Sequence, residues 1–182
     1  MARRIRIVAT IVAMALVASI MCIGIYAATQ VSVNGSGTIS MTAKDVAATV
    51  KGTQQYNSEA VTDLGTVEFA LNGTETEGTL NLKDTISFTS VNDTATIELT
   101  VKNGFADKES NNVKATLTLT IPEDAGYTVK VNDAAYTAAV TETTEGETDV
   151  VFTIKISMKE TSQEKDFSNN FAFKLDLEKA VA

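Results

Sequence analysis

The sequence predicts an all-β protein: an antiparallel two-sheet β-sandwich, jelly-roll or immunoglobulin-like, preceded by an N-terminal signal or transmembrane helix. Apolar and polar residues alternate with a period of two along most of the chain, and turn residues separate the alternating segments. An uncharged apolar stretch near the start has the length of a membrane-crossing helix. We therefore expect residues 1–28 to be an export segment and residues 29–182 to form a single β-sandwich domain.

The first residues have the three-part order of a signal peptide. Arginines at positions 3, 4 and 6 precede an uncharged stretch of about 19 residues, and the small residues Ala27 and Ala28 follow it. Cleavage after Ala27 or Ala28 is expected, which makes the protein secreted or exposed on the extracellular cell surface. A retained membrane anchor is the alternative, because such a stretch is long enough to cross about 30 Å of hydrocarbon.

Beyond residue 28 the chain is acidic and contains no cysteine. Of the 15 basic residues, three are the N-terminal arginines, and the remaining 12 are lysines opposed by 23 acidic residues. Nucleic acid is not an expected partner, because phosphate binding needs clustered basic side chains. Anionic lipid is repelled too, which limits membrane contact to the N-terminal segment. The single cysteine, Cys22, lies in that segment, so the exported part is expected to be stabilised by packing alone.

Alternation predicts the strands in chain order. The clearest are residues 113–121 and 152–158, in which inward apolar residues alternate with threonine, serine or lysine. The same pattern predicts strands near residues 31–33, 39–41, 67–71, 80–82, 86–88, 97–101, 127–131 and 171–177. Residues 51–63 and 141–149 are predicted to be solvated loops.

Turn residues support the same division. Positive φ is predicted at Asn34-Gly35, Asn72-Gly73 and Asn103-Gly104. Asn132-Asp133 are expected to be ordinary turn residues, and Pro122 ends the preceding strand because it lacks a ladder N–H. Short strands at this spacing, each with one polar face, indicate two packed antiparallel sheets.

The exported part has no histidine, cysteine or tryptophan. This removes Ser-His-Asp and Cys-His catalysis, histidine-bound zinc and thiolate chemistry, so we expect no enzyme, no catalytic residue and no cofactor. Serine-lysine or paired-carboxylate chemistry stays open but shows no recognisable spacing. One oxygen-rich loop is a calcium candidate, although a polar hairpin loop is the favoured interpretation because the spacing is irregular; its residues are Asn103, Asp107, Glu109 and Asn111.

Residues 26–28 read Tyr-Ala-Ala, and residues 36–44 read Ser-Gly-Thr-Ile-Ser-Met-Thr-Ala-Lys. This order resembles the start of the TasA and camelysin family of exported proteins, and residues 97–104 and 170–177 resemble later strands of that family. The resemblance implies a jelly-roll-like sandwich and a fibre subunit of the extracellular matrix. It also implies that a strand freed by signal cleavage, here residues 29–34 with Val31 and Val33, completes the sheet of the next subunit. Pairing of that segment within its own domain is the alternative.

Two functions follow from these observations. The first is a secreted or cell-surface structural protein, a matrix or fibre subunit that assembles with itself or with other surface components through β-strand exchange. The second is a surface adhesion module that binds carbohydrate or protein through its loops, with Tyr56, Tyr127 and Tyr136 as stacking surfaces.

Overall fold

The computed structural model describes residues 33–57, 59–71, 74–83, 86–88, 90, 92–121, 126–158 and 167–181. Within these residues the chain forms strands and turns and no helix, which confirms the all-β prediction. The strands are β1 (Val33–Lys44), β2 (Ala48–Tyr56), β3 (Thr62–Phe69), β4 (Glu75–Asn81), β5 (Ile86–Phe88), β6 (Thr94–Asn103), β7 (Asn111–Thr120), β8 (Tyr127–Val131), β9 (Ala134–Ala135), β10 (Val140–Thr143), β11 (Val150–Met158) and β12 (Phe167–Val181).

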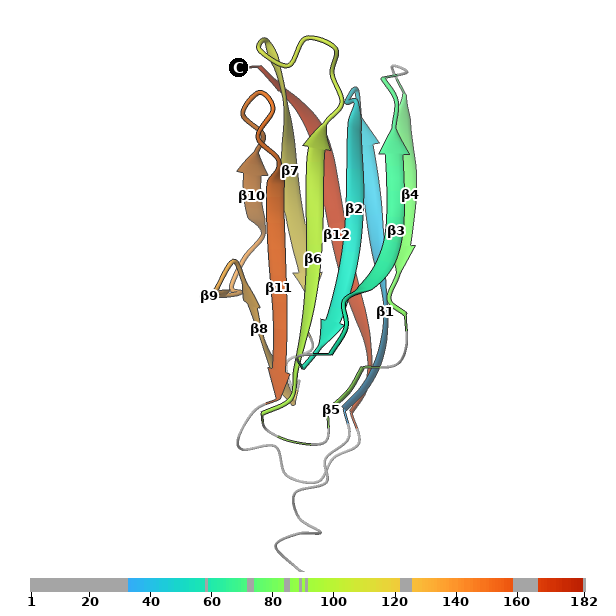
Figure 1. The fold of residues 1–182 in the computed structure, drawn as a ribbon, viewed down its shortest axis with the longest axis vertical. Helices are drawn as coiled ribbons and strands as arrows, with labels where there is room; N and C mark the ends of the chain where they lie inside the picture. Colours follow the sequence, from blue (N-terminus) through green and yellow to red (C-terminus); the bar gives the residue numbers. More distant parts are fainter. Residues whose placement is uncertain are drawn as a thin grey trace, which may run out of the picture.

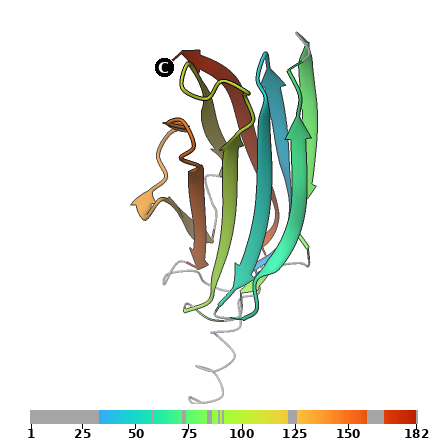
Figure 2. The same cartoon turned by 45° about the horizontal axis from the view of Figure 1, so that its top comes forward.

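The strands form two sheets that face each other as a β-sandwich (Figure 1). Sheet 1 has the order β10-β7-β12-β1-β4, with the short β5 also pairing with β1. Sheet 2 has the order β3-β2-β6-β11-β8-β9. Along one flank, β3 of sheet 2 and β4 of sheet 1 lie side by side, so the outer strands of both sheets meet there (Figure 2).

One pairing differs from the predicted antiparallel arrangement. The first and last strands, β1 and β12, run parallel in the middle of sheet 1, from Val33 opposite Phe167 to Lys44 opposite Glu178. Every other pair is antiparallel. Alternation could not distinguish the two directions, because parallel and antiparallel strands with one wet face share the same period.

The core lies between the two sheets and follows the predicted alternation. In β6 and β11 the inward side chains are buried, and the more exposed outward ones alternate with them. Residues with no exposed surface come from both layers: Ile39, Val50, Phe88, Ala95, Ile97, Leu99, Val101, Val113, Ala115, Leu117, Phe152, Ile154, Ile156 and Leu175. Burying one such leucine- or isoleucine-sized side chain contributes about 1.5–3 kcal/mol to folding, so this row of contacts stabilises the sandwich.

Residues 51–63 and 141–149 were predicted to be solvated loops, but both segments contain strand residues, so these two predictions are wrong. Residues 51–63 include most of β2, whose inward positions are Val50, Gly52 and Gln54. Because a glycine and a glutamine occupy inward positions there, the segment shows no alternation of apolar and polar residues. Gln54 is nevertheless buried, with only 7% of its surface exposed. Residues 141–149 likewise begin inside β10. Leu71, predicted to continue a strand inward, lies beyond the end of β3 and is 59% exposed.

Most residues with positive φ are not the ones that were predicted to have it. Asn34-Gly35 lies inside β1. Asn103 is the last residue of β6, and neither Asn103 nor Gly104 has positive φ. Positive φ occurs instead at Asp45 and Asn57 and at the predicted turn Asn132-Asp133, whose φ values of 49° and 63° suit a tight two-residue hairpin. Asn72-Gly73 and Pro122 lie outside the described residues.

Candidate functional site

The predicted donor segment is described only at its end. Val33 is the first residue of β1 and lies opposite Phe88 of β5 and Phe167 of β12, and Asn34 pairs with the same two strands. These two residues therefore pair within their own chain. Val31 and the predicted cleavage residues Ala27 and Ala28 lie outside the described residues.

The most regular open edge of sheet 1 is β4. It pairs with β1 on one side, and no described strand pairs with its other side. Leu82 N–H donates to Gly37 O at 2.9 Å, which fixes the hydrogen-bonding alternation of this antiparallel pair. The backbone groups of Thr76, Gly78 and Leu80 therefore point to β1. Those of the odd-numbered residues, from Glu75 to Asn81, point outward.

Two residues hold β4 against the sandwich. Leu80 is 4% exposed and points into the core. Gly78 lets β3 approach, because a Cβ there would lie 2.6 Å from Cγ1 of Val67 and 2.9 Å from Cζ of Phe69. The alternation of apolar and polar residues predicts a strand here only near residues 80–82. The glycine inside an alternating segment was the available signal, since such glycines often mark close approach of another strand.

The opposite edge of sheet 1 is short and closed by side chains. β10 covers only residues 114–117 of β7. Beyond one end, Thr144 Oγ1 accepts from Val113 N–H at 2.9 Å and Thr144 N–H donates to Val113 O at 2.9 Å. Beyond the other end, the Tyr136 hydroxyl accepts from Leu119 N–H at 2.8 Å. These side chains satisfy backbone groups that a longer strand would otherwise pair.

The outer strands of sheet 2 are irregular. The β2–β3 register shifts between Gly52 and Thr53, and Gly65 on β3 has φ of 112°. On the other side of sheet 2, β8 pairs only with residues 154–158 of β11. Asn132 then caps Thr153, the next residue of β11. Thr153 N–H donates to Asn132 Oδ1, and Asn132 N–H donates to Thr153 O, both at 2.9 Å. Bulges and short outer strands hinder addition of a further strand.

Charge is distributed differently between outer and inner strands. The outer strands β3, β4 and β10, and the two-residue β9, contain no lysine. Their acidic residues are Asp63, Glu68, Glu75, Glu77 and Glu142. Each long inner strand carries at least one lysine: Lys44, Lys51, Lys102, Lys114, Lys130, Lys155, Lys174 and Lys179. The outer strands β3, β4 and β10 therefore carry acidic side chains and no basic ones.

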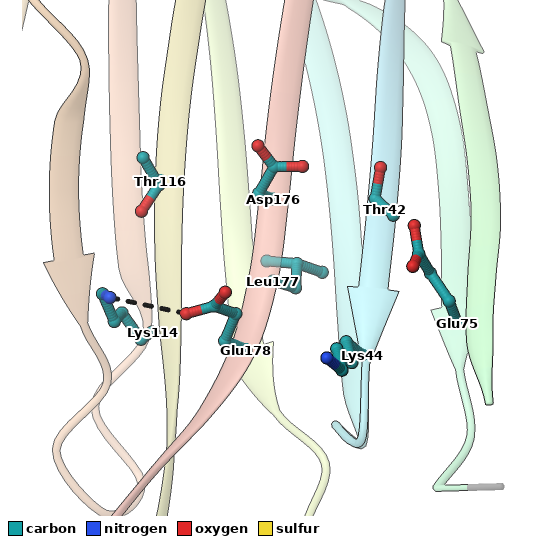
Figure 3. A pocket seen from close by; sticks show the side chains of 8 residues that line it. All are labelled: Thr42, Lys44, Glu75, Lys114, Thr116, Asp176, Leu177 and Glu178. Carbon is teal, nitrogen blue, oxygen red and sulfur yellow. Dashed lines mark hydrogen bonds and ion pairs between the residues drawn. The ribbon is translucent and has the colours of Figure 1, made fainter. Parts of the chain in front are cut away.

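A shallow hollow of about 290 Å³ lies on the outer face of sheet 1 (Figure 3). Across its floor a row of four residues alternates in charge, from Glu75 on β4 through Lys44 and Glu178 to Lys114 on β7. The Lys114 Nζ and Glu178 Oε2 atoms are 3.4 Å apart, with 45% and 60% of the side chains exposed. Exposed pairs of this kind contribute little to stability. The main consequence of the row is that opposite charges, rather than like charges, face each other on neighbouring strands.

The predicted calcium loop is held by its own hydrogen bonds. Asn103 Nδ2 donates to Asn111 O at 2.8 Å, and Asn103 Oδ1 accepts from Phe105 N–H at 3.0 Å. Asp107 Oδ1 accepts from Ser110 N–H at 3.2 Å. In the part of the chain that the structure describes, no three His, Cys, Asp or Glu residues cluster as a metal site would require.

The three tyrosines proposed for stacking are separated and differently used. Tyr127 is 2% exposed and packs edge-on against Phe171 at 5.1 Å, and burial raises its pKa. Tyr56 packs against Phe88 at 6.1 Å. Burial and a hydrogen bond to Asp93 raise the pKa of Tyr56 to about 12. The hydroxyl of Tyr136 accepts the hydrogen bond from Leu119 N–H of β7. Because Tyr127 is buried, it offers no surface for a ligand.

No protein-family model matches the chain, and no curated protein is significantly similar to it. Among the described residues, no helix is long and apolar enough to cross a membrane.

Proposed function

We propose that this protein is a secreted or cell-surface structural protein, without catalytic activity, that assembles with copies of itself through β-strand pairing. The observation that supports this most is the free edge of β4, a regular strand of seven residues that pairs with no described strand on one side. Free edges bind other strands through main-chain hydrogen bonds, which need no specialised side chains. Within this proposal the domain is a jelly-roll or immunoglobulin-like sandwich that resembles the TasA and camelysin proteins.

Strand exchange through residues 29–34 is the version that the family resemblance implies. The start of β1 offers a suitable place, because there Val33–Gly35 pair with the three-residue β5 on one side and with β12 on the other. The start of β12 lies at the same end of the sandwich (Figure 1). A strand supplied by a neighbouring copy would make the same backbone pairs, so exchange costs few interactions.

Two versions of the exported part test this proposal, one starting at Thr29 and one starting at Gly35. Their masses are compared by size-exclusion chromatography with light scattering over a wide concentration range, and thermal unfolding checks that both fold. Polymers of the longer version with a folded shorter version no larger than a dimer are the expected result. If both versions form polymers, exchange through residues 29–34 is wrong but self-assembly stands. If both stay monomeric at the highest concentration, the assembly function itself is wrong.

A further inference from the structure

The free edge of β4 is complementary to itself. Its outward-pointing backbone groups belong to Glu75, Glu77, Thr79 and Asn81, and the side chains of the same four residues are exposed on the outer face. Two copies related by a two-fold axis through Gly78 would place Glu75 opposite Asn81 of the second copy and Glu77 opposite its Thr79. Each carboxylate then faces an amide or hydroxyl donor, and every outward backbone group of the strand gains a partner.

The glutamates also select this register. An axis through Glu77 would place two carboxylates directly opposite each other, which destabilises a strand pair. An axis through Thr79 would place Glu75 opposite Lys83, which lies in a bend beyond the end of β4, so this register pairs less of the strand and forms fewer hydrogen bonds. The register centred on Gly78 is the one that pairs the whole strand and places no like charges directly opposite each other. It also brings the two Gly78 residues together on the inner side, where neither has a side chain.

The other described edges are less suited to this contact. β10 has four residues, and Thr144 and Tyr136 close the β7 edge on both sides of it. β3 contains the positive φ of Gly65 beside the register shift. β9 has two residues. None of these presents a regular edge as long as that of β4.

We propose that two copies of this chain associate through an antiparallel β4–β4 contact centred on Gly78, which joins two copies of sheet 1 into one continuous sheet. This inference rests on the proposed assembly function and names one surface that carries it. The contact is isologous and closes after two copies. Exchange of the N-terminal segment would involve the start of β1 rather than β4, so the two proposed contacts would not compete.

Cysteine cross-linking tests the register directly. The full-length chain is secreted from a Gram-positive host in a Cys22→Ser background, as two variants, Glu77→Cys and Thr79→Cys. Residues 77 and 79 of different copies form a hydrogen-bonded pair with Cα atoms about 5.5 Å apart, within disulfide range. Residue 77 lies diagonally from its own counterpart at about 7–8 Å, outside that range. Mild oxidation of the mixed variants should give at least about fivefold more covalent dimer than either variant alone.

A proline substitution tests the hydrogen bonds. Thr79→Pro removes an N–H that points away from β1, so the β1–β4 ladder stays complete. Thr141→Pro is the matched control: it makes the same change at an exposed threonine of β10 whose N–H also points away from its paired strand. Sedimentation of the secreted chain should show association at least about tenfold weaker for Thr79→Pro and unchanged for Thr141→Pro, with both melting near the parent.

The outcomes separate this contact from the broader function. Equal cross-linking in all three samples, or none, overturns the β4–β4 contact, and if light scattering still shows assembly the structural function is retained. A monomer whose odd-numbered β4 amides, which point away from β1, exchange slowly with solvent would mean that another segment of the same chain covers the edge, which overturns the contact. A monomer whose odd-numbered β4 amides exchange fast would overturn the contact and the assembly function together.

Discussion

β4 and β10 are the outer strands at the two ends of the main strand order of sheet 1, yet they end the sheet differently. β4 leaves a regular row of backbone groups open along seven residues. β10 is short, and side chains on both sides of it take up the backbone groups of β7 that it leaves uncovered. The comparison shows that one sheet can have a long edge suited to pairing and an edge reduced to a short strand, and that a threonine and a tyrosine are enough to cap the part of β7 that β10 leaves uncovered.

The largest effect is expected at Gly78, where β4 depends on close approach by β3. Gly78→Val should lower the free energy of unfolding by about 3 kcal/mol, because a Cβ alone would lie 2.6 Å from Val67 and 2.9 Å from Phe69. Thr79→Val, on the exposed face of the same strand, is the control and should change it by less than about 0.5 kcal/mol. Urea denaturation of the monomeric form measures both. Equal small effects would show that β3 does not position β4.

A smaller effect is expected where Thr144 closes the β10 side. Thr144→Val keeps the shape but leaves the buried N–H of Val113 without its acceptor, which should cost about 2 kcal/mol. Thr143→Val, at the exposed neighbouring position, serves as the control and should be near neutral. Hydrogen exchange at Val113 should become faster only in the Thr144 variant. Unchanged protection would mean that the cap is not needed to close this edge.

Sequence reasoning was reliable where the pattern was apolar and local. Alternation located β6, β7, β11 and β12 because every second residue there is large and buried. It missed β2, where Gly52 and Gln54 occupy inward positions, and it could not give the parallel pairing of β1 with β12, which joins the two ends of the described chain. Pairing between distant strands leaves no trace in the local period.

The candidate edges were still harder to foresee. Which strand lies outermost depends on the order of all strands in a sheet, and that order is not encoded in any one segment. Tyr136 was interpreted as a surface for ligands, but its hydroxyl accepts a hydrogen bond from a strand 17 residues earlier. Thr144 fell in an acidic segment predicted to be a loop, although it is only 1% exposed. Side-chain caps on backbone groups become visible only after the fold has placed both partners.

The smallest effect should distinguish two tyrosines that undergo the same change. Tyr136→Phe removes the acceptor of Leu119 N–H and should lower the free energy of unfolding by about 1 kcal/mol, with faster exchange of that amide. The hydroxyl of Tyr127 is buried and has no hydrogen-bond partner among the described residues, so Tyr127→Phe should leave stability unchanged or raise it slightly. If both variants lose the same amount, removal of a tyrosine hydroxyl rather than loss of the cap explains the result. If only Tyr136→Phe does, a single hydroxyl helps to close the β10 edge.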